Sequence, residues 1–279
     1  MISQPDLKRD FLFVSDFDQT LSYNDSGQVL SEIAGISDFA GRVRKLSRTH
    51  LVQQGGELAY LLLHDSDFRK VRREHLREAG KKVRLKSNIR LLSETLRQIE
   101  GARFSFYVVS AGPQDIVESA LDGILPADHI FASQLKFNGR GEVSGVETLR
   151  AGYGKVAILD RLRTELPVSH NNIVYVGDGS SDIHVMLHVN RLDGLTIAVS
   201  ENRHLAPIAR RTVLSDNALS VLIPIFEEIL QWETAQIRSF FEERGFVVQD
   251  WEKVQTDTIS IMKTATNQDA LAMEKVAPA

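Results

Sequence analysis

The sequence predicts an α/β protein: a doubly wound, mostly parallel sheet with a Rossmann-like core and an inserted helical cap. Short, continuous apolar runs alternate with stretches of helical periodicity along most of the 279 residues. Residues 24–88 interrupt this alternation, because they contain helix-prone pieces but no convincing strand. Strand–helix alternation favours right-handed crossovers and a parallel sheet covered by helices on both faces.

Four apolar runs are candidate buried strands. They are continuous rather than alternating, which is typical of strands covered on both faces. A hairpin is also expected within residues 135–145, where Asn138-Gly139 is a strong signal for a tight turn. The four candidates are FLFVSDF (11–17), FSFYVVSA (104–111), IVYVGD (173–178) and LTIAVS (195–200).

Helical patterns separate the strand candidates. Ile89, Leu92, Leu96 and Ile99 recur at near-helical spacing, which predicts an amphipathic helix. Pro113 suits the first position of the next helix, because its missing N–H is not needed there. The remaining helices of the core are expected within residues 155–166, 182–189 and 220–232.

These patterns divide the chain into three parts. Residues 1–23 and 89–231 are expected to form the α/β core, and residues 24–88 the helical cap. Residues 232–279 predict a helical C-terminal extension, whose aromatic residues suit packing on the core or on a second subunit. Its final stretch, TATNQDALAMEKVAPA, is poor in large apolar residues, and we expect it to be mobile.

The composition excludes several classes of protein. A hydrophobic fraction of 43% is ample for a packed core and argues against global disorder. The absence of cysteine excludes disulfides, thiolate metal sites and cysteine nucleophiles. The net charge of −4 does not predict a nucleic-acid-binding protein. Because no apolar run reaches about 18 residues and no signal-peptide pattern begins the chain, we expect a cytoplasmic protein that does not engage a membrane.

Polar residues stand where the strand candidates end. Asp16 and Asp18 end the first run, and Ser110 ends the second. Asp178 ends the third, and Asp182 follows closely. In an open α/β sheet, ligands bind beyond the carboxyl ends of the strands. We therefore expect these residues, which are distant in sequence, to share one crevice.

Carboxylates gathered in one crevice repel one another. Two unit charges about 4 Å apart cost about 4 kcal/mol at an effective dielectric constant of about 20. Mg²⁺ is the natural cation to offset this repulsion, because it prefers carboxylates, water and phosphate oxygens. Lys155 would add a fixed positive charge at a helix start. The hydroxyl of Ser110 and the amides of Ala111 and Gly112 suit an anion, so the site predicts a phosphate ligand.

Four short motifs occur in order along the chain: DFDQT (16–20), VVSAG (108–112), the lysine of GYGK (Lys155) and GDGSSD (177–182). With these motifs the chain resembles the haloacid dehalogenase-like phosphatases. The resemblance is greatest to the phosphoserine-phosphatase-like branch, which carries a helical cap after its first motif. It extends over residues 11–230, so it covers the expected core and cap.

The resemblance implies a role for each motif residue. Asp16 would attack phosphorus and form an aspartyl-phosphate, and Asp18 would protonate the leaving oxygen and then activate water. Asp16, Asp178 and the backbone carbonyl of Asp18 would hold Mg²⁺. Thr20 would steady the loop, and Asp182 would orient the metal shell or the lysine. The phosphoryl oxygens would be bound by Ser110, Ala111, Gly112 and Lys155.

Residues that would contact the substrate depart from the phosphoserine phosphatases. Gln28 stands where that branch has a glutamate, and a neutral amide cannot balance a substrate ammonium. Asp25 lies close enough in sequence to substitute for it. No arginine occurs within residues 56–68, the stretch most similar to the arginine-bearing part of the cap. The second motif has Ala111 in place of the usual glycine, which should narrow the loop. We therefore expect a small phosphorylated metabolite other than phosphoserine as substrate.

Other interpretations stay open. The protein could hydrolyse phosphoserine after all, or transfer the phosphoryl group to an alcohol in place of water. A non-enzymatic alternative keeps the fold to bind a phosphate ligand or a partner. The basic segment 68–86 is either a solvated helix face or a positive rim that attracts an anionic substrate, and it lacks the interleaved aromatics of a nucleic-acid surface. The sequence leaves the oligomeric state open, a homodimer included.

Overall fold

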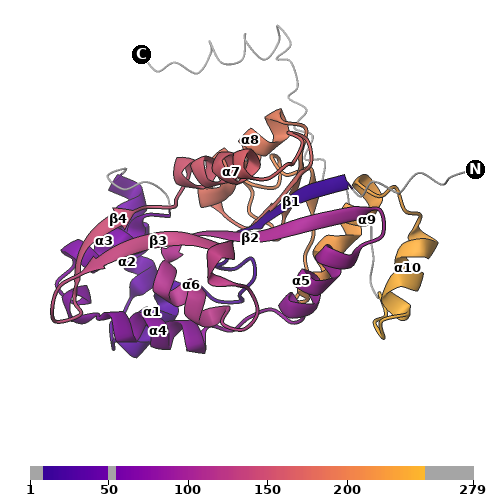
Figure 1. The fold of residues 1–279 in the computed structure, drawn as a ribbon. Coiled ribbons are helices and arrows are strands. Elements are labelled where there is room, and N and C mark those ends of the chain that lie inside the picture. The colour runs from indigo at the N-terminus through magenta and orange to yellow at the C-terminus, as the bar shows by residue number, and fades with distance from the viewer. Residues whose placement is uncertain (1–8, 50–54, 249–279) are drawn as a thin grey trace, which may run out of the picture.

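A seven-stranded sheet with the order β4-β3-β2-β1-β5-β6-β7 runs through the molecule (Figure 1). The computed structural model describes residues 9–49 and 55–248. Neighbouring strands pair in parallel, except β3 and β4, which are antiparallel. The predicted doubly wound, mostly parallel α/β fold is therefore confirmed.

The four strands expected from the apolar runs form the centre of the sheet. β1 pairs with β2 on one side and with β5 on the other, so Phe13 lies opposite Phe106 and Val174. The central strands are β1 (Arg9–Ser15), β2 (Ala102–Pro113), β5 (Ile173–Gly177) and β6 (Leu195–Ala198). β3 (Ile130–Phe137) joins them to the edge strand β4 (Val143–Thr148), and β7 (Arg211–Thr212) forms the other edge.

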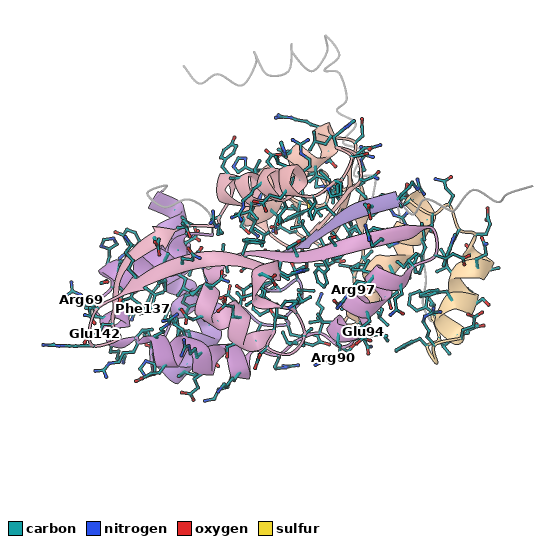
Figure 2. All side chains as sticks on the ribbon, in the orientation of Figure 1. Arg69, Arg90, Glu94, Arg97, Phe137 and Glu142 are labelled. Atoms are coloured by element: carbon teal, nitrogen blue, oxygen red, sulfur yellow. The ribbon has the colours of Figure 1, made fainter. Side chains whose placement is uncertain are left out.

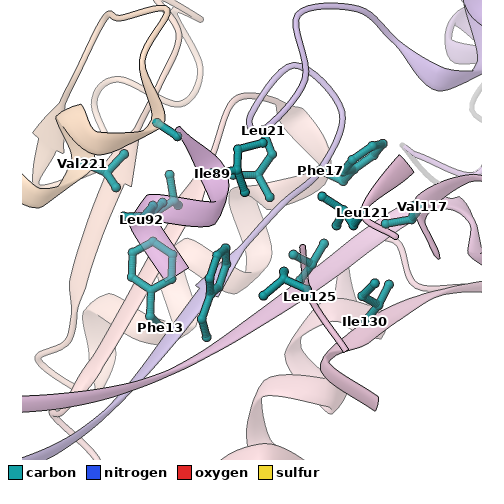
Figure 3. Packing of buried hydrophobic residues seen from close by; sticks show 14 of the residues in the cluster. Phe13, Phe17, Leu21, Ile89, Leu92, Val117, Leu121, Leu125, Ile130 and Val221 are labelled. Atoms are coloured by element: carbon teal, nitrogen blue, oxygen red, sulfur yellow. The ribbon is translucent and has the colours of Figure 1, made fainter. Parts of the chain in front are cut away.

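Helices cover both faces of the sheet. Leu12 and Val14 of β1 pack on the side of α7 and α8, whereas Phe11 and Phe13 pack on the opposite side (Figure 3). These four side chains are at most 3% exposed, which explains why the run is continuously apolar. The helices after the insert are α5 (Ile89–Gln98), α6 (Gln114–Ala120), α7 (Tyr153–Glu165), α8 (Ile183–Arg191), α9 (Leu222–Glu228) and α10 (Thr234–Glu242). Pro113 caps α6 rather than beginning it, because β2 extends up to this residue.

The described elements of residues 24–88 are helices, as expected. The chain leaves and re-enters the core along two adjacent stretches: Tyr23 N–H donates to Arg84 O, and Lys86 N–H donates to Leu21 O, both over 2.8 Å. The two connections therefore form one paired junction. The helices are α1 (Ser26–Ile33), α2 (Phe39–Thr49), α3 (Glu57–His64) and α4 (Arg73–Lys82), with a 3-10 turn at Phe68–Lys70. The division of the chain into core, cap and extension stays a prediction.

The last helix of the insert, α4, packs closely on α6. A Cβ at Gly80 would lie 2.3 Å from the backbone oxygen of Ile116, so only glycine permits this approach. Arg73 Nε lies 2.7 Å from Asp115 Oδ1, and Arg77 Nε lies 3.4 Å from the same oxygen. Two residues of the basic segment 68–86 thus connect α4 to the start of α6.

The expected hairpin is present, but its turn is longer than an Asn-Gly turn. Asn138 N–H donates to Glu142 O, and Gly141 N–H donates to Asn138 O, each over 2.9 Å. Gly141, with φ of 76°, supplies the left-handed conformation. The hairpin reaches the helical insert, where Arg73 lies over the Phe137 ring at 5.2 Å (Figure 2 labels Phe137 and Glu142).

Aromatic side chains attach α10 to the core. Phe226 stacks on Trp232 with 4.5 Å between ring centroids, and it contacts Phe240 at 4.7 Å. Phe241 is buried beside them. Residues 249–279, with the tail expected to be mobile, lie outside the described residues. None of the helices in the described part of the chain is long and apolar enough to cross a membrane.

Candidate active site

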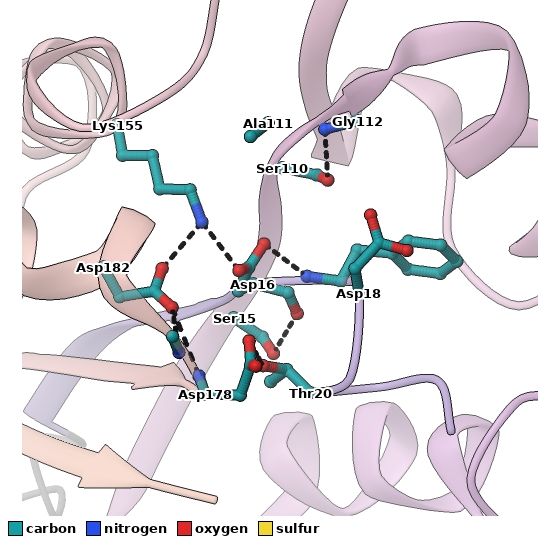
Figure 4. Close-up of polar contacts among 12 residues, drawn as sticks. Ser15, Asp16, Asp18, Thr20, Ser110, Ala111, Gly112, Lys155, Asp178 and Asp182 are labelled. Carbon is teal, nitrogen blue, oxygen red and sulfur yellow. Dashed lines mark hydrogen bonds and ion pairs between the residues drawn. The ribbon is translucent and has the colours of Figure 1, made fainter. Parts of the chain in front are cut away.

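The polar residues that end β1, β2 and β5 lie together at one edge of the sheet (Figure 4). Asp16 follows β1, Ser110 lies near the end of β2, and Asp178 follows β5. They meet because β1 lies between β2 and β5 in the sheet. Lys155, in the first turn of α7, and Asp182, at the end of the 3-10 turn before α8, complete the group.

Lys155 is the buried cation of the site. Its side chain is 0% exposed, and its Nζ lies 2.8 Å from Asp16 Oδ2 and 2.7 Å from Asp182 Oδ1. Burial by itself lowers the pKa of Lys155, but the charges of Asp16 and Asp182 outweigh it and hold the pKa above its ordinary value. Lys155 therefore stays charged within the site.

Each of the two carboxylate oxygens of Asp16 contacts a protein donor. Its Oδ1 accepts from Phe17 N–H over 2.7 Å, while Oδ2 contacts the lysine. Burial, followed by the charge of Asp182, raises the pKa of Asp16 to about 7, although Lys155 acts in the opposite direction. A second cation besides Lys155 is therefore needed to keep this carboxylate fully ionised at neutral pH.

Asp182 has all its acceptor positions engaged. Oδ1 accepts from Lys155 Nζ and from the Tyr175 hydroxyl, each over 2.7 Å. Oδ2 accepts from the N–H groups of Asp178 at 3.2 Å and Gly179 at 3.1 Å. A carboxylate offers about four lone-pair positions, so Asp182 has none left for a metal ion. Tyr175 was missed in the sequence, because its place in an apolar run indicates a core residue.

Asp178 has few protein donors. Its Oδ1 accepts one long hydrogen bond, 3.4 Å, from Thr20 Oγ1. Burial, followed by the charges of Asp16 and Asp182, raises its pKa to about 8. Oxygens of these three aspartates lie within 4.8 Å of one another. This all-oxygen donor set fits Mg²⁺, and Asp16 and Asp178 are the carboxylates able to face the ion.

Asp18 points away from Lys155 and toward the first residue of α1. Ser26 donates its N–H to Asp18 Oδ1 over 2.7 Å and its hydroxyl to Oδ2 over 2.9 Å. Burial, then the charges of Asp25 and Asp16, raise the pKa of Asp18 well above its ordinary value, which favours the protonated form. That the backbone carbonyl of Asp18 binds the metal ion stays a prediction. Ser26 was missed, although its place beside the capping residue of a helix was a possible signal.

The last residues of β2 come close to Asp18. Ser110 is 1% exposed, and its Oγ accepts from Gly112 N–H over 3.0 Å. A Cβ at Gly112 would lie 3.1 Å from Asp18 Oδ2. Glycine therefore lets the backbone of the second motif approach the acid of the first.

Gly55, in the segment that precedes α3, rests against three residues of the core. A Cβ there would lie 3.1 Å from the Cβ atoms of Ala111, Ala151 and Ser181. The loop is fixed by Glu57, whose Oε2 accepts from Gly55 N–H over 2.7 Å. The helical insert thus reaches the second and fourth motifs, and the methyl group of Ala111 faces it. Sequence reasoning also missed Gly55, for which the paired glycines of QQGG were a weak signal.

Asp25 and Gln28, the expected specificity residues, both belong to the start of α1. Asp25 Oδ1 caps the helix by accepting from the N–H groups of Gly27 at 2.8 Å and Gln28 at 3.2 Å. The Gln28 amide donates to Glu32 Oε1 over 2.9 Å. Burial raises the pKa of Asp25. A role of either residue in substrate recognition stays a prediction.

Comparison with known proteins agrees with the four motifs. The family model of the haloacid dehalogenase-like hydrolases matches residues 13–187. The chain belongs to this family. Because the match includes all four motifs, the resemblance drawn from the sequence is confirmed. No curated protein sequence matches the chain.

Solved structures share the fold of this haloacid dehalogenase-like hydrolase. A substrate-bound phosphoserine phosphatase is 21% identical, with a TM-score of 0.61, over 77% of this chain and 98% of that one. A phosphoserine phosphohydrolase-like protein from Francisella tularensis is 17% identical, with a TM-score of 0.59, over 77% and 99%. A hydrolase of the same family from Salmonella enterica is 13% identical, with a TM-score of 0.63, over 81% and 75%. At these identities the likeness shows the fold alone.

Proposed function

We propose that this haloacid dehalogenase-like hydrolase is a Mg²⁺-dependent phosphatase of a small phosphorylated metabolite, acting through an aspartyl-phosphate. The observation that carries the proposal is that carboxylate oxygens of Asp16 and Asp178 lie within 4.8 Å of each other, while Asp16 is also paired with the buried ammonium of Lys155. This arrangement offers a nucleophile, a metal-binding pair of carboxylates and a fixed cation for phosphoryl oxygens.

In the first step, a carboxylate oxygen of Asp16 attacks phosphorus and the bond from phosphorus to the leaving oxygen breaks. Asp18 gives its proton to that oxygen, which suits its raised pKa. Asp16 and Asp178, with the Asp18 carbonyl, would hold Mg²⁺, whose chemistry is to neutralise charge on the phosphoryl oxygens. Ser110 and Lys155 would hold the same oxygens by hydrogen bonds.

In the second step, water attacks phosphorus and the bond from phosphorus to the Asp16 oxygen breaks. Asp18, now a carboxylate, takes the proton of that water. Inorganic phosphate leaves, and both aspartates return to their starting forms. The two steps need no further reactant.

The substrate is proposed on the contacts at α1. Gln28 is neutral and bound to Glu32, and Oδ1 of Asp25 caps the helix, so at these two positions only the second oxygen of Asp25 remains for an ammonium group. This favours a metabolite other than phosphoserine. Phosphoserine is the second candidate, because two of the structural relatives above are named for it.

Phosphate release from a panel of phosphate esters, with Mg²⁺ or with EDTA, tests the proposal. The panel contains phosphoserine, sugar phosphates, nucleotides and phosphocholine. We expect Mg²⁺-dependent release that Asp16→Asn abolishes, and Asp10→Asn, at a partly exposed aspartate of the same strand, preserves. Beryllium fluoride should inhibit the unaltered protein by occupying Asp16. Release that survives Asp16→Asn would refute the nucleophile.

Two further arms address the alternatives. Adding alcohol acceptors and following new ester against free phosphate detects phosphotransfer. Phosphate binding without any turnover across the panel would favour the non-enzymatic interpretation. Sedimentation of the same preparation reports whether the protein is a homodimer.

A further inference from the structure

Lys86 lies at the junction through which the helical insert returns to the core, and the mechanism above does not use it. Its N–H donates to Leu21 O over 2.8 Å. Its neighbour Leu85 forms a bridge with Ser22, and Ser87 N–H donates to Asp216 O over 3.3 Å. The backbone of Lys86 is therefore held between the loop that follows β1 and the loop that precedes α9.

The side chain of Lys86 is partly buried, and the loop that its backbone contacts also carries Thr20, whose hydroxyl donates to Asp178 over 3.4 Å. Burial lowers the pKa of Lys86, and the carboxylates of Asp178 and Asp216 act in the opposite direction. Neither carboxylate forms an ion pair with it within 4.0 Å, nor does any other acid in the described part of the chain. Lys86 is thus a second cation close to Asp178 that no protein acid neutralises directly.

The position of Lys86 affects the charge balance of the candidate metal site. Asp16 and Asp182 share the ammonium of Lys155, and Asp178 has no ion pair among the described residues, so the site without metal is short of positive charge. Lys86 offsets part of this deficit at the side of Asp178. A divalent ion at Asp178 would instead be repelled by the ammonium, because like charges interact strongly at a partly buried site.

We infer that Lys86 is a built-in competitor of Mg²⁺ that weakens metal binding at Asp178 and so sets the metal affinity of the site. The inference rests on the proposed function in one respect, that Asp178 is a metal ligand. The paired junction holds the Lys86 backbone against both the core and the insert. Lys86 would therefore act on the ion by electrostatic repulsion, without contacting it.

Direct titration of the metal-stripped full chain with Mg²⁺ by calorimetry tests this inference without any turnover. We expect Lys86→Met to bind Mg²⁺ about three to ten times more tightly at low ionic strength, and the difference to shrink at high salt. Lys86→Arg should bind as the unaltered protein does. Lys81→Met removes an exposed charge from the same basic segment and should leave the affinity unchanged.

The outcomes separate this inference from the proposed function. No Mg²⁺ binding by the unaltered protein would overturn the metal site and the inference with it. If the unaltered protein binds Mg²⁺ and Lys86→Met binds it equally tightly or more weakly, the inference alone would be overturned. A rise in KM in Lys86→Met with unchanged Mg²⁺ affinity would assign Lys86 to the substrate and also overturn it. Lys86→Gln serves as a second variant if Lys86→Met does not fold.

Discussion

Lys155 and Asp182 form an ion pair in which both side chains are completely buried, with Nζ 2.7 Å from Oδ1. The same ammonium contacts Asp16, so one lysine neutralises two acids. A buried ion pair stabilises only where its remaining hydrogen-bonding positions are satisfied. Tyr175 and two backbone amides provide this for Asp182. The pair therefore keeps Asp16 in place and compensates for its burial.

Removing the ammonium should destabilise the fold. Lys155→Met leaves two buried carboxylates without a cation, and we expect a loss of about 3–5 kcal/mol in the free energy of unfolding. Urea unfolding with EDTA near neutral pH measures it. Lys81→Met, at an exposed position, should change the value by no more than about 0.5 kcal/mol. Equal losses in the two variants would contradict the compensating role of the buried pair.

The metal-free protein should lose stability as pH rises. In the folded chain the pKa of Asp16 is about 7 and that of Asp178 about 8, against 3.8 for a free aspartate. The folded state therefore binds protons more tightly than the unfolded chain. The stability that Asp16 and Asp178 contribute when protonated is fully present below about pH 4 and is lost as the pH rises through about 7 to 8. Thermal melts with EDTA across this range measure the slope. Asp178→Asn should reduce this slope. A melting temperature that rises with pH would contradict the raised pKa values of Asp16 and Asp178.

Mg²⁺ should reverse this decline. Protons and the metal compete for the same carboxylates, so Mg²⁺ should raise the melting temperature more at about pH 8 than at about pH 5. Melts at both pH values, with Mg²⁺ or with EDTA, provide the comparison. In Asp178→Asn the effect of Mg²⁺ should fall at both. A larger Mg²⁺ effect in acid would indicate that the ion binds elsewhere.

A methyl group at Gly55 should damage catalysis as well as stability. Gly55 has φ of 89°, and its Cβ would lie 3.1 Å from Ala111, Ala151 and Ser181. Gly35 is a matched control, because it has φ of 61° but nothing within 4 Å of its Cβ position. We expect both alanine variants to lose about 1–2 kcal/mol through backbone strain. Only Gly55→Ala should lower kcat/KM, and equal kcat/KM in the two variants would refute the contact's importance.

A double-mutant cycle tests whether Arg73 joins the insert to the core or attracts substrate. Arg73 is about half exposed, with a side-chain exposure of 53%, so its coupling to Asp115 should be below about 1 kcal/mol. Arg69→Ala is the control, at an exposed arginine of the same segment (Figure 2). If Arg73 joins the insert to the core, only Arg73→Ala should couple energetically to Asp115→Asn. A similar, salt-dependent rise in KM in both arginine variants would support the positive rim instead.

The sheet was predictable from the sequence because its central strands are buried on both faces. β1 and β5 are continuous apolar runs bounded by polar residues, and that pattern distinguishes them from amphipathic helices. The two-residue β7 carries no such pattern, so sequence alone did not find it. The hairpin was expected, but its left-handed residue is Gly141, which lies beyond the Asn138-Gly139 pair on which the tight turn was predicted.

The site was predictable where its residues end strands. Asp16, Ser110 and Asp178 needed only the rule that parallel strands end at one edge. Tyr175 and Ser26 were not predictable in this way, because their roles depend on which partner the fold brings near. A tyrosine within an apolar strand indicates a core residue until Asp182 is placed beside its hydroxyl.

Both oxygens of Asp18 meet donors on one residue, Ser26, and one of those donors can reverse direction. A hydroxyl accepts as readily as it donates, so a protonated Asp18 can donate to Ser26 Oγ across the same 2.9 Å. The carboxyl group can therefore alternate between its two ionic states while its heavy atoms stay still. Since Ser26 begins α1, the position of that helix sets both donors that hold the Asp18 carboxyl group, and under the proposed function it would therefore orient the proton donor.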